Sequence, residues 1–217
     1  MRSIYSANEL TDLILEAGFM PLFPCGIPGF SVFEYTAESF EDFFAEDAGW
    51  DWRDILARHD ALAYGKFFNG KAGVISAEWF PFFANIRRNG KPFEEAFHDG
   101  QLKQSAYTVL KLYEKQTVLP RWEIFNRAGI RRSESLITDL EMRTYLITCG
   151  FERKRNKRGE EYGWPASLYC IPEDKFGEET IVSRYHESPD DSLWELVRQC
   201  RRFTHFDDDE GICRLLK

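Results

Sequence analysis

The densest chemical signal in the sequence is a short run of cations. Arg153, Lys154, Arg155, Lys157 and Arg158 place five positive charges within six positions, and Gly159 follows them as a turn residue. Such a run can lie along the phosphates of a nucleic acid, where each neutralised phosphate adds a salt-dependent contribution to affinity. Two alternatives stay open: a solvated hairpin tip, or a contact with an acidic protein surface, including the ends of this chain.

Charge is unevenly distributed along the 217 residues, whose formal net charge is −8. Residues 101–158 hold 13 Lys and Arg against 6 Asp and Glu. The flanking segments are acidic, with 8 against 16 in residues 1–100 and 7 against 14 in residues 159–217. Because salt screens charges beyond roughly 8–10 Å, a polyanion at close range meets the basic segment rather than the total.

A second cluster mixes aromatic rings with charged groups in the first half of the chain. Its candidate pocket residues are Tyr64, Lys66, Glu78, Trp79, Arg87 and Arg88. Rings beside cations suit a pocket for an extruded base, and Glu78 is then a candidate for acting on a water. The alternative is that the rings fill the core and the arginines pair with nearby acids. The high content of 19 Phe, 6 Trp and 9 Tyr favours a well-filled core.

Metal, cofactor and disulfide chemistry are not indicated. The five cysteines are scattered without a CxxC pair, which indicates reduced thiols. Cys200, His205 and Cys213 fit no standard zinc spacing, and the acidic run 207–210 is predicted to be a solvated end. No apolar run approaches the ~18–20 residues of a membrane span, and the first residues lack the pattern of a signal peptide. We therefore expect a cytoplasmic protein without metal, cofactor or membrane association.

Turn residues and apolar spacing predict the elements that position the front cluster. Leu10, Leu13 and Ile14 recur at helical spacing and predict a helix over 7–17, ended by Gly18. Asn69-Gly70 between two apolar runs predicts a hairpin with strands 63–68 and 71–75. Also expected are a rigid connection over 19–30, a strand over 31–35, helices over 36–44 and from residue 50, and a helix from Ser76 with Pro81 in its first turns.

The second half predicts the elements that position the cationic run. They are a helix over 103–116, a short helix from Pro120 to Gly129, a helix capped by Ser133, a strand over 144–148, a charged loop over 152–163 and a strand over 164–171. This is the order of a winged helix-turn-helix, with the cations on the wing. A further helix is expected over 192–203.

The predicted fold class is therefore α+β. An aromatic-rich N-terminal α+β region (1–100) is followed by the winged helix-turn-helix module (101–176) and a C-terminal helical tail (177–217). The helix after Ser133 would enter a major groove, yet its outward positions include Glu134, Asp139 and Glu141 beside Arg143, and carboxylates repel phosphates. We expect Arg131, Arg132 and the wing to dominate any DNA contact, with weak sequence selectivity.

Two sets of residues resemble a known superfamily. The stretch 136–147, followed by Tyr162-Gly163-Trp164 and Pro172-Glu173, resembles the winged-helix region of the AlkZ-like (YcaQ-like) DNA glycosylases. The segments 29–32, 64–68, 71–76 and 78–81 resemble a shorter branch called AlkZ-related, a similarity that covers most of the chain. The resemblance implies a DNA-related lineage.

This sequence departs from the glycosylases at their catalytic motif. Those proteins are much longer, with tandem winged helices, and position the attacking water with a Gln-x-Gln or Gln-x-Asp motif. Here glutamine occurs only at positions 101, 104, 116 and 199, and none has Gln or Asp two positions on. No catalytic residue can therefore be transferred from the family.

Three functions remain as hypotheses. The first is a winged-helix protein that binds double-stranded DNA with weak sequence selectivity. The second is a DNA glycosylase that acts on modified bases through a different carboxylate. The third is a protein-interaction module without nucleic-acid binding. DNA binding without base release supports the first, abasic-site formation the second, and no affinity for DNA at low salt the third.

Overall fold

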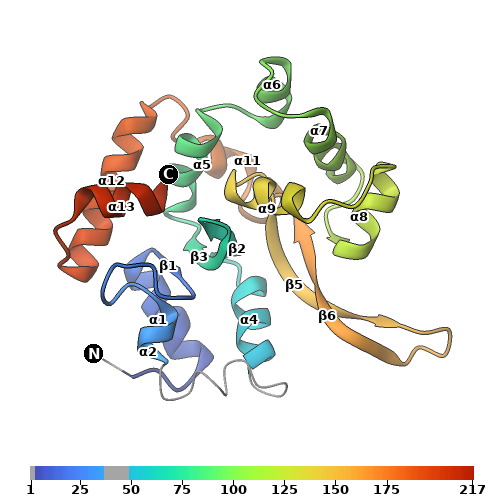
Figure 1. Cartoon of the computed structure of the whole chain (residues 1–217), viewed down its shortest axis with the longest axis horizontal. Helices are drawn as coiled ribbons and strands as arrows, with labels where there is room; N and C mark the ends of the chain where they lie inside the picture. The colour runs from blue at the N-terminus through green and yellow to red at the C-terminus, as the bar shows by residue number, and fades with distance from the viewer. Residues whose placement is uncertain (1–2, 37–48) are drawn as a thin grey trace.

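The computed structural model describes residues 3–36 and 49–217 as an α+β protein, which confirms the predicted fold class (Figure 1). In chain order the elements are α1 (Ala7–Ala17), β1 (Phe19–Pro21), α2 (Val32–Tyr35), α4 (Gly49–Arg58), β2 (Leu62–Phe68), β3 (Lys71–Ser76), α5 (Phe80–Arg88), α6 (Phe93–His98), α7 (Gln104–Leu110), the 3₁₀ helix η1 (Lys111–Glu114), β4 (Leu119–Pro120), α8 (Arg121–Ala128), α9 (Glu134–Met142), β5 (Ile147–Arg155), β6 (Glu161–Cys170), α10 (Pro172–Phe176), α11 (Glu178–Val182), α12 (Pro189–Thr204) and α13 (Asp209–Leu216).

One antiparallel sheet joins the two halves of the chain. Its strand order is β1-β3-β2-β5-β6-β4. The junction between the halves is the pairing of β2 with β5, in which Tyr64 lies opposite Thr148. The hairpin of β2 and β3 and the hairpin of β5 and β6 are therefore held in one sheet. The division at residues 100/101 and 176/177 stays a prediction, and the sheet runs across the first of these boundaries.

The predicted hairpin at Asn69-Gly70 is confirmed. Phe68 pairs with Lys71, so the connection has two residues. Asn69 has φ 51° and Gly70 has φ 74°, both in the left-handed region. A two-residue type I′ turn needs this conformation at both positions, and Asn followed by Gly adopts it at low cost.

Local signals also position α1 and α5. The predicted helix over 7–17 is confirmed, with Ser6 accepting from the Glu9 N–H and Gly18 ending it at φ 84°. A Cβ at Gly18 would lie 2.5 Å from Trp79 Cδ1, so this glycine also permits close packing. The helix α5 begins at Phe80 with Trp79 as its N-cap, rather than at Ser76, and Pro81 lies in its first turn as predicted.

Two expectations for the front half are wrong. The segment expected as a strand over 31–35 is helix α2, because the Glu34 carboxylate accepts from Ser31 Oγ at 2.6 Å and from the Gly29 N–H at 2.9 Å. These bonds turn the chain back on itself. Residues 19–21, expected as part of a connection, form strand β1 against β3. Thr36 is the C-cap of α2, and the rest of the helix expected over 36–44 lies outside the described residues.

Aromatic rings fill the interior. Phe19 meets Phe30, Trp79 and Phe83 edge-on, with ring centroids 5.0–6.0 Å apart. These rings belong to a core packed between the sheet and the helices α5, α12 and α13, and a separate core lies beneath α7, α8 and α9. Within the described ranges, no helix combines the length and the apolar composition that a membrane span requires.

The C-terminal region 177–217 holds three helices, α11, α12 and α13, where the sequence pattern predicted one. The expected helix over 192–203 is α12, which starts earlier, at Pro189. The acidic run is largely exposed, as expected of a solvated end, but it also begins α13: Asp208 accepts from the Gly211 N–H at 2.9 Å, and Arg201 pairs with Asp207 and Asp209. Carboxylates satisfy the free N–H groups at a helix start and interact favourably with its dipole, which explains the difference.

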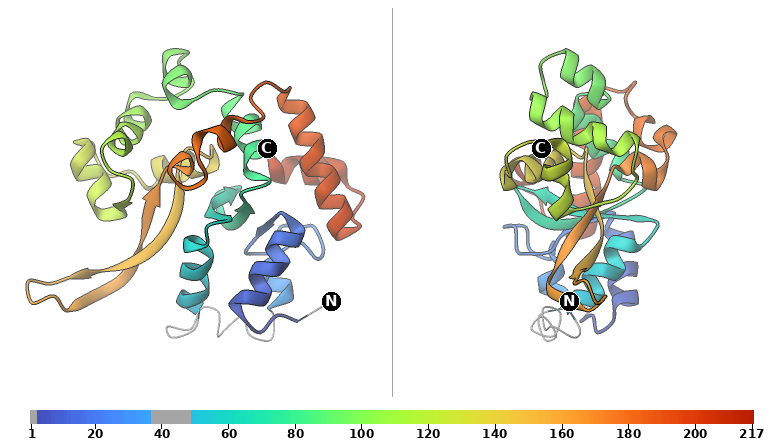
Figure 2. Two further views of the ribbon diagram at one scale, coloured as in Figure 1. Left: turned by 180° about the vertical axis from the view of Figure 1, so that it is seen from behind. Right: turned by 90° about the vertical axis from the view of Figure 1, so that its right-hand side faces the viewer.

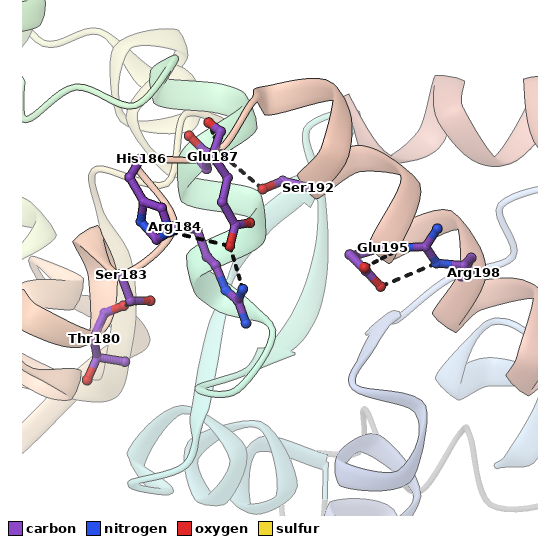
Figure 3. A network of polar contacts seen from close by, with 9 residues as sticks. Thr180, Ser183, Arg184, His186, Glu187, Ser192, Glu195 and Arg198 are labelled. Carbon is purple, nitrogen blue, oxygen red and sulfur yellow. Dashed lines mark hydrogen bonds and ion pairs between the residues drawn. The ribbon is translucent and has the colours of Figure 1, made fainter.

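Polar contacts hold α12 and its preceding segment against α5. The buried Asn85 side chain donates to Ser192 Oγ at 2.9 Å and to the Glu187 carbonyl at 3.3 Å. In the same network Arg184 reaches the Glu187 carboxylate at 2.6 Å (Figure 3). The C-terminal helices are therefore part of the same packed body as the front half of the sheet.

Arg88 makes the most extensive buried polar contact between the two halves. Its side chain is 1% exposed. The guanidinium donates to the carbonyl and hydroxyl of Thr144, to the Tyr185 hydroxyl at 3.1 Å and to the Glu173 carboxylate. It also lies over the Tyr145 ring, 4.5 Å from the centroid. One side chain on α5 therefore fixes the segment before β5 and the start of α10.

Arg88→Met is expected to lower the free energy of unfolding by roughly 3 kcal/mol, because Glu173 and the Thr144 carbonyl lose a buried charged donor. This is the lower end of the range for a broken buried pair, since Glu173 keeps some solvent contact. Urea unfolding followed by tryptophan fluorescence measures the change. The matched control is Arg198→Met, whose exposed pair with Glu195 should contribute less than about 1 kcal/mol. Equal losses in the two variants would contradict the assigned role.

Candidate nucleic-acid interface

The cationic run belongs to a region of three helices, α7, α8 and α9, and three strands, β4, β5 and β6. Gly129 ends α8 in the left-handed conformation at φ 64°, and Ser133 caps α9 by accepting from the Leu136 N–H, as predicted. The two strands β5 and β6 pair with each other, and the short β4 pairs with β6. Ile137 and Leu140 form the apolar face of α9, and they pack in the core that α9 shares with α7 and α8.

The wing, defined here as residues 147–170, is longer than expected. The segment 152–163, expected as a loop, is mostly strand, because β5 continues to Arg155 and β6 begins at Glu161. Arg155 pairs with Glu161 across the strands at 2.7 Å, and Asn156 Oδ1 accepts from two backbone N–H groups in the turn. These contacts extend the hairpin into an arm that reaches away from the helices (Figures 1 and 2). The strand expected from residue 144 starts at Ile147 instead.

The five wing cations are placed along this arm. Lys154, Arg155, Lys157 and Arg158 are exposed, and Arg153 is partly exposed. Arg155 is the member with an ion pair, to Glu161. For the other four, no carboxylate of the described residues lies within ion-pair distance. An arm with most of its cations unneutralised is a favourable site for a polyanion.

A hollow of about 400 Å³ lies between the wing and α8. Lys154 lines this hollow, and so does Arg132, one of the two arginines before α9 that are expected to contact DNA. Arg121 and Trp122 complete this side of it. The Lys154 ammonium lies 5.4 Å from the centroid of the Trp122 ring. The structure therefore brings one cation of the wing and one of these two arginines to a shared surface. Arg131 lines a different hollow, of about 700 Å³, beside Lys103 and Arg143.

The wing also carries two exposed rings, which belong to the segment 162–164 that resembles the glycosylases. Tyr162 is 51% exposed and Trp164 is 70% exposed, both on β6. Large rings at this exposure are available for stacking, and Tyr162 lies opposite Lys154 in the strand register. Their adjacency to a cationic run was visible in the sequence, but their exposure was not.

The carboxylates on α9 should repel a phosphate less than the sequence predicts, because two are in ion pairs and one is buried. Glu134 pairs with Arg121 and Arg132, and Asp139 pairs with Arg143 at 3.1 Å. Glu141, expected on the outward face, is 1% exposed and points inward, which corrects that expectation. The helix surface is therefore nearly neutral rather than acidic.

Glu141 is a buried carboxylate at the junction of the two halves. Thr148 Oγ1 donates to its Oε1 at 3.2 Å, and Oε2 has no hydrogen-bond partner. Burial raises the pKa of Glu141 to about 7, against the lowering effects of Lys66 and of the Thr148 hydrogen bond. Lys66 itself donates to Thr138 Oγ1 at 3.2 Å. Glu141 lies four residues after Ile137, and this spacing places both residues on one face of the helix, so the periodicity could have marked the position as inward.

The six candidate pocket residues of the front half are dispersed. Glu78 is exposed, Trp79 packs on Phe19 and Phe82, and Tyr64 is buried against Phe151. Lys66 faces α9, as described above. Arg87 donates to the carbonyls of Phe67 and Leu216, and Arg88 is buried in the contacts with Thr144 and Glu173. These contacts support the alternative in which the rings and arginines serve packing.

No group of three or more His, Cys, Asp or Glu side chains is placed to hold a metal ion in the part of the chain that the structure describes. Comparison with known proteins gives one finding: a family model described as AlkZ related matches residues 4–217. No curated protein and no solved structure matches the chain. The family match spans both the front half and the wing.

The raised pKa of Glu141 predicts a pH-dependent stability. Its pKa rises from an ordinary 4.5 to about 7 on folding, so its favourable contribution is complete below pH 4.5 and is lost as the pH rises through 7. The loss is about 3 kcal/mol. Glu141→Gln removes this titration, so its unfolding free energy relative to the natural protein should increase between pH 5 and 8. Urea unfolding at both pH values measures it.

The control is Glu210→Gln, at a carboxylate that is 88% exposed, for which the difference from the natural protein should not change with pH. A difference for Glu141→Gln that stays constant from pH 5 to 8 would mean that the carboxyl is not held protonated by burial.

Proposed function

The chain belongs to the AlkZ-related family, and on that premise we propose that it is a winged-helix protein that binds double-stranded DNA through its wing with weak sequence selectivity. The observation that carries the proposal is the extended β5–β6 arm, with four cations that have no described ion-pair partner. The family match supports a relation to DNA-glycosylase-like proteins.

The order of elements supports a winged-helix assignment. The series α7, β4, α8, α9, β5 and β6 follows the arrangement helix, short strand, helix, helix and two-stranded wing. The short strand β4 pairs with β6, which completes a small sheet beside the three helices. In this arrangement α9 is the recognition helix and the wing lies beside it, so both can approach one duplex.

The side chains support backbone contact more than base reading. The outward carboxylates of α9 are engaged by Arg121, Arg132 and Arg143, which leaves few free donors for base edges. Arginine and lysine on a projecting arm can contact phosphates, which are the same in every sequence. Arg132 and Lys154 extend this cationic surface from the wing towards α8.

The remaining acidic charge sets the expected strength. The net charge of −8 opposes long-range association with DNA, although salt screens it beyond roughly 8–10 Å. The wing projects from the body, so its cations reach a phosphate before the acidic segments do (Figure 2). Modest affinity and a steep salt dependence follow from these two facts.

Base excision receives less support. Glu141 has a pKa suited to proton transfer, but it is buried and lines none of the described hollows. Glu78 is exposed and shares no hollow with the other candidate pocket residues among the described ones. We therefore leave catalysis unassigned, and an abasic-site assay on DNA with modified bases distinguishes a glycosylase from a binding protein.

Replacing Arg153, Lys154, Arg155, Lys157 and Arg158 with Ser is expected to weaken binding to all duplexes about equally. Each lost phosphate contact lowers the slope of log affinity against log salt by about 0.9, so the full set lowers it by up to roughly 4.5. Fluorescence anisotropy on several unrelated duplexes, at two or more salt concentrations, measures both quantities.

The matched control is a triple Ser variant of Arg198, Arg202 and Arg214, which lie on α12 and α13 away from the wing. Its salt slope should equal that of the natural protein. If the natural protein does not bind at about 50 mM salt, or if the wing variant binds equally well, the proposal fails and the interaction-module hypothesis replaces it.

A further inference from the structure

Two cysteines meet where the wing leaves the sheet. Cys149 lies at an irregularity of β5, between the pairs Thr148–Tyr169 and Gly150–Leu168. Cys170 ends β6 opposite Ile147. Both side chains line one hollow, and Cys149 Sγ donates to the Leu168 carbonyl at 3.5 Å. The strand register, which joins residues far apart in the sequence, is what creates this dithiol.

A hollow of about 500 Å³ opens onto both sulfur atoms. Its other lining residues are Arg58, Thr117, Val118, Asp174 and Lys175. Cys149 is half-buried, whereas Cys170 is only 4% exposed. A small molecule that enters the hollow therefore meets Cys149 first, with Cys170 behind it.

The surroundings give the two sulfur atoms different properties. The neighbouring Cys170 thiol lowers the pKa of Cys149, and the nearby Lys175 and Arg58 act in the same direction, against the effect of burial. The same contact and burial raise the pKa of Cys170. By contrast, burial raises the pKa of Cys25, Cys200 and Cys213. A thiolate is the reactive form of cysteine, so the environment favours reaction at Cys149.

We propose that Cys149 and Cys170 form a redox modification site, at which Cys149 attacks a small organic disulfide in the hollow and Cys170 then completes an internal disulfide. This inference is independent of the proposed DNA binding. The site lies at the base of the wing, so the product joins β5 to β6 covalently where the arm begins.

The chemistry balances in two exchange steps. The Cys149 thiolate bonds to one sulfur of the small disulfide, whose S–S bond breaks to release the other half as a thiolate. Cys170, on losing its proton, attacks Cys149 Sγ, and the second half leaves as a thiolate. The protein loses two electrons and two protons, and the small disulfide is reduced to two thiols.

The test uses the full chain and oxidised glutathione as the disulfide, with peptide mass mapping under non-reducing conditions. The natural protein should yield a Cys149–Cys170 linked peptide and lose two of its five free thiols. Cys170→Ser should instead accumulate one glutathione adduct per chain, on Cys149. Cys149→Ser should lose the linked peptide completely and form little adduct on the buried Cys170.

Cys213→Ser is the matched control, because Cys213 is half-buried and lies outside the pair, and it should form the linked peptide as the natural protein does. Circular dichroism establishes that each variant is folded. Adducts that form first on Cys25 or Cys213, or a natural protein that gives no Cys149–Cys170 linkage, would overturn the proposal, and the mapping of the natural protein alone decides this even if a variant misfolds.

Discussion

The arrangement of the two halves depends on the buried guanidinium of Arg88. This side chain on α5 donates to Thr144, directly before β5, and to Glu173 at the start of α10. Thr144 has φ 62°, a conformation that is costly for a β-branched residue and that persists only where its surroundings enforce it. This turn lies directly before β5, so the Arg88 contacts hold the start of that strand in place.

The same junction explains how an acidic protein presents a basic surface. The sheet carries β5 and β6 out of the body, so the cations of the wing are separated from most of the acidic side chains. The wing itself carries Glu152, Glu160 and Glu161, of which Glu161 pairs with Arg155 and Glu160 accepts a hydrogen bond from Asn156. On the neighbouring α9, Glu134 pairs with Arg121 and Arg132. Screening then isolates the remaining positive charge from the negative total.

The interface between the halves contains polar groups that a simple apolar core would exclude. Glu141 and Thr148 meet beneath α9, and Lys66 reaches α9 from β2. Burial of a carboxylate is tolerated when the group is protonated or hydrogen-bonded. Here burial raises the pKa of Glu141 to about 7, which favours its protonated form. Such groups add geometric specificity to the β2–β5 junction, where only the single pair Tyr64–Thr148 is in register.

The sequence by itself determined the features that depend on neighbouring residues: α1 between Ser6 and Gly18, the Asn69-Gly70 hairpin, the Ser133 cap and the cationic run. The short segment before Tyr35 was ambiguous, because an apolar run of that length fits a strand as well as a helix turned by Glu34. Only the tertiary structure decided the β2–β5 pairing, the length of the wing and the placement of Cys149 and Cys170 on one hollow. Each of these arises from contacts between residues far apart in the chain, and such contacts leave no period or cap in the local sequence.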